Sequence, residues 1–166
     1  MSKTDISYTR ILCPVDFSEC SRKAFYNAVG YARHFSAELV ILHVSERNMA
    51  VAGFDTVEDQ HETMARLEAG LQRRLDELET DGQVTDEDRE RISLEIAGGK
   101  PWVEIIRYAT DHDCDLIIMG THGHAGLKHI VIGSQAERVV RRAPCAVLCV
   151  KPEGYVSTLS PPLIQE

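Results

Sequence analysis

The feature that most constrains the fold is a series of five short apolar runs, separated by segments long enough to form helices. The runs are Ile11–Val15, Leu39–Val44, Ile92–Ala97, Leu116–Met119 and Ala146–Val150. Four of them are rich in Val, Ile and Leu with little polar alternation, which is typical of strands covered on both faces in a parallel sheet. The third run alternates polar and apolar residues, so we expect an edge strand there.

Helical periodicity fills most of the intervals between these runs. Ser18 is expected to cap the first helix, and Pro101 and Ser134 are expected to open the last two. The expected apolar faces are Ala24, Phe25, Ala28, Val29, Ala32 and Phe35; then Met64, Leu67, Leu71, Leu75 and Leu78; then Val103, Ile106 and Ala109; and finally Ala136, Val139 and Val140. The almost wholly polar segment Thr80–Arg91 is interpreted as a surface loop or a frayed helix end.

Strands that alternate with helices predict βαβ units and a parallel sheet. We therefore expect one doubly wound α/β domain over residues 1–152, with an open, mostly parallel five-stranded sheet. The tail from Pro152 holds three prolines and lacks a periodic pattern, so we expect residues 153–166 to be a loosely ordered C-terminal extension.

Composition narrows the class of protein. The net charge of −8 argues against a nucleic-acid-binding protein, which would need a broad basic surface. No apolar run approaches the roughly 20 residues of a membrane span, and the first ten residues lack the apolar stretch of a signal peptide. An odd number of cysteines without a CxxC pair favours a reducing compartment, so we expect a cytoplasmic protein.

The residues at the carboxyl ends of the strands are the candidates for chemistry, because ligands of open α/β sheets bind there. The first strand ends in Pro14, Val15 and Asp16, the second in His43, Val44 and Ser45, and the fourth in Met119 and Gly120. Asp16 is interpreted as a ligand for ribose hydroxyls or Mg2+, with a helix-capping role as the alternative.

Three glycines follow the fourth strand at a distinctive spacing. Gly120 and Gly123 permit a sharp turn, and Gly133 precedes Ser134, which we expect to be a helix N-cap with Glu137 completing a capping box. Free amides at a helix start suit an anion such as phosphate. The alternative is that the glycines serve only as turn and cap residues. Neither GxxxxGK[ST] nor GxGxxG is present, which disfavours a P-loop NTPase and a standard dinucleotide dehydrogenase.

The pattern Gly120-x2-Gly123-x9-Gly133-Ser134 resembles the nucleotide-binding signature of the universal stress protein family, in its ATP-binding branch. The opening Arg10–Ser18, the Leu42–Val44 strand end, Gly99-Lys-Pro101 and the closing Ala143–Val150 also resemble that family. The resemblance implies an adenine nucleotide alpha hydrolase-like fold. It further implies that Asp16 and Val44 contact the base and ribose, and that phosphates are cradled by Gly120, His122, Gly123, Gly133, Ser134 and Gln135.

The expected ligand is ATP with Mg2+, and the sequence leaves ADP and AMP open. The resemblance also implies a homodimer through the last strand, Ala146–Val150, and a regulatory protein partner. The leading hypothesis is thus a nucleotide-dependent stress-response regulator without a dedicated catalytic residue. The alternatives are a weak ATP hydrolase or nucleotidyl-transfer enzyme, and a binding module that takes no nucleotide. His122, His124 and His129 lack a further ligand at metal-site spacing, so we expect no protein-built metal site.

Overall fold

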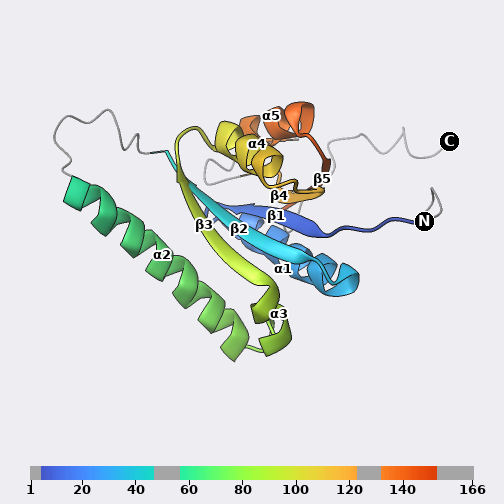
Figure 1. Cartoon of the computed structure of the whole chain (residues 1–166), viewed down its shortest axis with the longest axis horizontal. Helices are drawn as coiled ribbons and strands as arrows, with labels where there is room; N and C mark the ends of the chain where they lie inside the picture. The colour runs from blue at the N-terminus through green and yellow to red at the C-terminus, as the bar shows by residue number, and fades with distance from the viewer. Residues whose placement is uncertain (1–4, 47–56, 123–131, 153–166) are drawn as a thin grey trace, which may run out of the picture.

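The computed structural model describes residues 5–46, 57–122 and 132–152, and its described strands form one parallel five-stranded sheet. The elements in chain order are β1 (Arg10–Val15), α1 (Glu19–Phe35), β2 (Glu38–Ser45), α2 (Val57–Thr80), α3 (Asp86–Arg91), β3 (Ile92–Gly98), α4 (Pro101–Asp111), β4 (Leu116–Gly120), α5 (Ser134–Arg142) and β5 (Ala146–Val150). The strand order is β3-β2-β1-β4-β5, so the expected doubly wound fold is confirmed (Figure 1).

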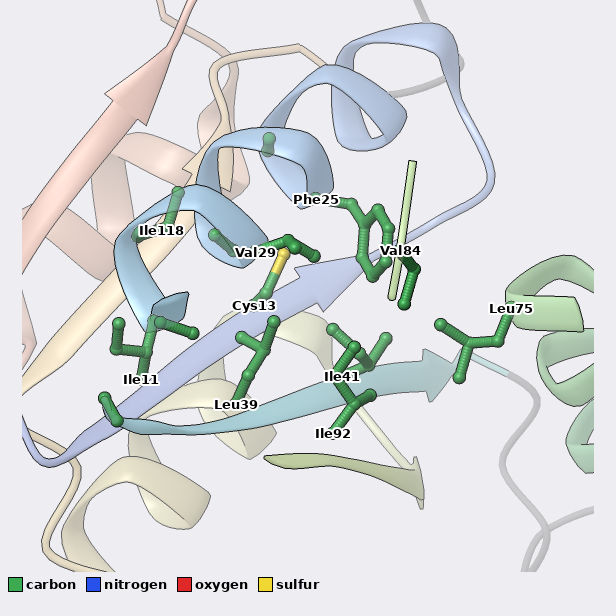
Figure 2. Packing of buried hydrophobic residues seen from close by; sticks show 14 of the residues in the cluster. Ile11, Cys13, Phe25, Val29, Leu39, Ile41, Leu75, Val84, Ile92 and Ile118 are labelled. Atoms are coloured by element: carbon green, nitrogen blue, oxygen red, sulfur yellow. The ribbon is translucent and has the colours of Figure 1, made fainter. Parts of the chain in front are cut away.

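The helices form two layers around the sheet. Figure 1 shows α4 and α5 on one face, with α1 and α2 on the other. Two apolar cores result, one on each face of the sheet. In the core beneath α1, Ile11, Cys13 and Leu39 are fully buried and lie beside Val29 (Figure 2). Full burial of one such aliphatic side chain contributes about 1.5–3 kcal/mol, so these cores hold the sheet rigid beneath its carboxyl edge.

Helix α1 begins where its sequence predicts. The Ser18 hydroxyl caps it by accepting from the Ser21 amide at 3.1 Å, and Ser36 ends it in the left-handed region at φ 54°. The expected apolar face is confirmed, with Phe35 half-buried and the other members buried. The sharp start of α1 fixes the backbone that leaves β1 at the carboxyl edge.

The interpretation of Thr80–Arg91 as a loop or frayed end holds for residues 81–85 but is wrong for Asp86–Arg91, which is helical. Helix α2 runs to Thr80, and a second short helix, α3, follows after one turn. Thr85 caps α3 in a capping box with Asp88, whose carboxylate accepts from the Thr85 amide at 2.9 Å. Asp88 is 5% exposed and also binds the guanidinium of Arg33 in α1, which fastens α3 to the body of the fold.

Two apolar faces differ from expectation by one position. In α4 the buried residues are Ile105 and Ala109, whereas Ile106 is half-buried. In α5 Val139 is buried but Val140 is 47% exposed. In both helices, packing against the neighbouring helix and the sheet selects one of two adjacent apolar residues. The expected edge strand is confirmed, because β3 lies at one end of the sheet and β5 at the other.

Candidate functional site at the carboxyl edge of the sheet

The strand order reverses between β1 and β4, which makes the carboxyl edge there the expected place for a ligand. The β1–β2 ladder continues to Val15↔His43, but the β1–β4 ladder holds only at Ile11↔Leu116 and Leu12↔Ile117. Pro14 explains part of this difference, because it has no N–H for a ladder. The last part of β1 is therefore not hydrogen-bonded to β4, at the point where the chain turns toward α1.

A tight turn follows β1. The Asp16 carboxylate accepts from the Ser18 amide at 2.9 Å, and Phe17 between them lies in the left-handed region at φ 64°. An aromatic residue in this region is uncommon, and such conformations cluster at functional sites. Asp16 is half-buried and shapes the turn, while the helix cap itself is Ser18.

Two aromatic side chains at this edge were given no role by the sequence analysis, although His43 was among its strand-end residues. Phe17 is 47% exposed, and its ring lies 4.8 Å from that of His43 between centroids. His43 Nδ1 lies 2.9 Å from the Val15 carbonyl oxygen, which can only accept, so Nδ1 carries the proton. A role for His43 could have been inferred from its place beside Val44. The left-handed backbone conformation of Phe17, in contrast, has no signal in the sequence.

The backbone after β4 is held between α1, β5 and the start of α5. The Thr121 amide donates to the Val150 carbonyl at 2.9 Å, and the Thr121 carbonyl accepts from the Gly133 amide at 2.7 Å. A Cβ at Gly133 would lie 2.9 Å from that same carbonyl oxygen, and one at Gly120 would lie 2.9 Å from Cys20 Sγ. Both glycines are thus needed for close approach of the backbone.

Helix α5 begins with a first turn that no side chain of the described residues caps. Its N-cap is Gly133 and not Ser134, so the expected N-cap and capping box are wrong. Glu137 instead forms an ion pair with Arg141 at 3.0 Å. Without a side-chain cap, the first amides of the helix point outward at the positive end of its dipole, which is the arrangement that binds anions.

The side chain of Gln135 connects α5 to α4. Its Oε1 accepts from the amide of Trp102 at 3.3 Å, in the first turn of α4. The two helix starts therefore lie side by side at this edge. His122 is half-buried, and its Nδ1 lies 2.8 Å from the hydroxyl of Thr121.

The expected site residues divide between the two faces of the sheet. Val44 and Met119 belong to the core beneath α4 and α5, and Met119 is buried. Val15 packs with the core on the α1 face, and Pro14 is buried within β1. Gly123 lies outside the described residues, so its role stays a prediction. Gly120, His122, Gly133, Ser134 and Gln135 meet where β4 leads into α5.

Trp102 packs at the start of α4. Its ring lies below the guanidinium groups of Arg138 and Arg142, at 5.8 and 5.2 Å from the ring centroid. Both arginines are exposed, so they form a solvated face of α5 while they also make a cation–π contact with the indole.

No group of three His, Cys, Asp or Glu side chains within the described ranges could hold a metal ion. A magnesium ion at this edge would therefore take most of its ligands from water and phosphate oxygens, which is its usual habit. Among the described residues, the Asp16 carboxylate suits such a role, since it lies directly after β1.

The model of the universal stress protein family matches residues 7–151 of this chain. The chain belongs to the universal stress protein family. Universal stress protein MJ0531 of Methanocaldococcus jannaschii is 35% identical over 146 residues, which cover 87% of this chain and 82% of that protein. The resemblance expected from the glycine pattern is confirmed.

Solved structures of universal stress proteins have the same fold. The universal stress protein UspA from Lactobacillus plantarum is 28% identical and superposes with a TM-score of 0.65, covering 88% of this chain and 99% of its own. A universal stress protein solved in complex with cAMP is 19% identical, with a TM-score of 0.60 over 87% of this chain and 98% of its own. No helix of the described ranges is long and apolar enough to cross a membrane.

Proposed function

We propose that this universal stress protein binds ATP at the carboxyl edge between β1 and β4, and that the bound nucleotide sets a conformation read by a regulatory partner. The proposal rests mainly on the uncapped first turn of α5. Its first turn has no side-chain cap among the described residues, and Gly133 holds it against the backbone of Thr121. A fold neighbour solved with cAMP supports the view that this architecture accommodates an adenine nucleotide.

The phosphates would lie at the β4–α5 junction. The amides of Ser134 and Gln135 would donate to them, with Gly120, Gly123, Gly133 and His122 shaping the cradle. One helix start contributes about 0.3–2 kcal/mol, whereas a micromolar ligand needs about 8 kcal/mol. Most of the affinity must therefore come from burial of the base and from further hydrogen bonds.

The base and ribose would lie over the ends of β1 and β2. Val44 offers an apolar contact, and Asp16 offers a carboxylate to the ribose hydroxyls. Pro14 and Val15 at the end of β1 and Met119 at the end of β4 would lie beneath the nucleotide, with Met119 on the α4 and α5 face and Val15 on the α1 face. Mg2+ would neutralise phosphate charge when bound, and the protein would orient it through Asp16.

The last strand supports a homodimer. β5 lies at the end of the sheet, and Ala146 at its start is exposed while the next three residues are half-buried. An apolar edge strand is a template for pairing with a second copy. Sedimentation of the wild type should show a dimer that dissociates on dilution, and Ala146→Lys should shift it to monomer. A monomer at all concentrations would contradict the proposal.

The chain is proposed to act in the cytoplasm, which its five free thiols support. ADP and AMP remain alternative ligands, and weak ATP hydrolysis or nucleotidyl transfer is the alternative function. No described contact favours catalysis over binding.

The test is direct identification of the ligand. Freshly purified protein is denatured and any released nucleotide is identified by chromatography and mass. ATP, ADP and AMP are then titrated calorimetrically into stripped protein, with GTP as the control. Saturable binding of ATP in preference to GTP supports the proposal. Neither release nor uptake of any adenine nucleotide would refute it.

A further inference from the structure

A cavity lies on the face of the sheet opposite to most of the proposed nucleotide contacts. It has a volume of about 560 Å³ and is formed by the start of α1, the C-terminal half of α2, and strands β2 and β3. Small-molecule sites usually measure about 300–1,000 Å³, so this cavity is of ligand size. Of the residues expected to contact the nucleotide, only Val15 lines this cavity.

The floor of this cavity is apolar. It is made by Phe25 of α1, Ile41 of β2, and Leu71, Leu75 and Leu78 of α2, each at most 6% exposed. Figure 2 shows Phe25, Ile41 and Leu75 pointing toward one another from three different elements. Because α2 packs mainly on β3, its leucines do not fill the space in front of α1.

The rim of the cavity is cationic. The charged residues that line it are three arginines and two glutamates, namely Arg22, Arg73, Arg74, Glu19 and Glu77. Arg74 pairs with Glu77 at 2.7 Å, and Arg22 lies 4.0 Å from Glu19. Arg73 forms no ion pair with a carboxylate of the described residues. The rim thus has one guanidinium left to receive an anion.

We propose that this cavity binds an amphipathic anion, namely a linear alkyl chain that ends in a carboxylate. The chain lies on the apolar floor between Phe25 and Leu75, and the carboxylate pairs with Arg73. A guanidinium matches a carboxylate with two parallel hydrogen bonds, which neither an alcohol nor an amine can accept in the same way. This proposal does not depend on nucleotide binding.

The experiment is calorimetric titration of the full chain with dodecanoate below its micelle concentration, beside dodecanol and dodecylammonium. We expect dodecanoate to saturate one site and the other two probes to bind more weakly. Arg73→Glu should weaken dodecanoate binding by about tenfold or more, the loss of one charge-assisted contact. Arg141→Glu, on the opposite face, is the matched control and should leave the affinity within about twofold, since it removes only a surface pair.

A second variant fills the cavity. Leu75→Trp places an indole on the floor and should abolish saturable binding, with circular dichroism and thermal unfolding checking that the variant folds. If it does not fold, the exposed Arg73→Glu variant decides alone. Absence of saturable dodecanoate binding would overturn the proposal. So would equal binding of the three probes, or equal effects of Arg73→Glu and Arg141→Glu.

Discussion

The amide of Gly133 donates to the carbonyl of Thr121 at 2.7 Å, although the two residues are 12 positions apart in the sequence. A Cβ on Gly133 would stand 2.9 Å from the same oxygen. Because Thr121 is also bonded to Val150 at the end of β5, this contact sets where α5 begins relative to the sheet. The proposed phosphate site depends on that placement.

Gly133→Ala should therefore impair nucleotide binding as well as lower stability. The backbone oxygen of Thr121 must move to admit the methyl group, which displaces the first amides of α5. We expect ATP affinity to fall by about tenfold or more, with a loss of unfolding free energy of about 1–3 kcal/mol. Calorimetry and urea unfolding measure the two effects.

Gly30→Ala is the matched control. Gly30 lies within α1, and a Cβ there would meet no atom within 4 Å. The substitution should raise the unfolding free energy by about 0.5–1 kcal/mol, because alanine is the better helix former. ATP affinity should stay unchanged, and a loss as large as that of Gly133→Ala would contradict the assigned role of the junction.

Substitutions at Asp16 distinguish its structural role in the turn after β1 from its proposed role in nucleotide binding. Asp16→Asn keeps an oxygen that can accept from the Ser18 amide, whereas Asp16→Ala removes it. We expect Asp16→Asn to fold with near wild-type stability but to bind ATP more weakly in the presence of Mg2+. Asp16→Ala should lose about 1 kcal/mol of stability as well. If Asp16→Asn bound ATP as the wild type does, the carboxylate would have no part in the site.

The Arg33–Asp88 contact makes stability depend on pH. Hydrogen bonds from the Arg33 guanidinium hold the pKa of Asp88 well below its usual range, against the opposing effect of burial. A depressed pKa means that the unfolded chain binds the proton more readily. The contact is therefore fully stabilising above about pH 4 and is lost progressively as the pH falls below that value.

Asp88→Asn should lower the unfolding free energy by about 1–3 kcal/mol at pH 7 and flatten its decline between about pH 5 and 2. Urea unfolding at several pH values measures both. The control is Glu87→Gln, because Glu87 is 74% exposed in its pair with Arg91 and should change stability by less than about 0.5 kcal/mol. Equal pH profiles for wild type and Asp88→Asn would contradict this account.

The sequence predicted the parts of this structure that depend on local patterns. Apolar runs predicted the strands, and Ser18 and Pro101 predicted two helix starts correctly. Helix α3 was missed although the pattern Thr85-x-x-Asp88 is a capping-box signal. Its short polar sequence has no apolar face, and it is held by Arg33, which lies 55 positions away.

The candidate site was predicted less completely, because tertiary packing determines it. The spacing of glycines indicated the β4–α5 junction, but Ser134 is not the cap, since the backbone of Gly133 already occupies that place beside Thr121. The early end of the β1–β4 pairing and the left-handed Phe17 depend on neighbouring strands and helices. The cavity beneath α2 arises from the distance at which two helices pack, which periodicity does not specify.

Two buried thiols should resist modification. Burial raises the pKa of Cys13 to about 12 and that of Cys114 to about 11, and Cys13 is 0% exposed. Since the thiolate is the reactive form, both should stay unmodified by a disulfide reagent at pH 8 in the folded protein and react in urea. Mass spectrometry of labelled peptides checks this, and rapid native labelling of Cys13 would contradict the described core.

The most direct test of the central claim is a crystal structure of the protein with ATP and Mg2+. We expect the phosphates to lie at the amides of Ser134 and Gln135, with the base and ribose over Val44 and Asp16. Nucleotide found only elsewhere on the molecule, or a junction left without nucleotide at saturating ATP, would contradict it.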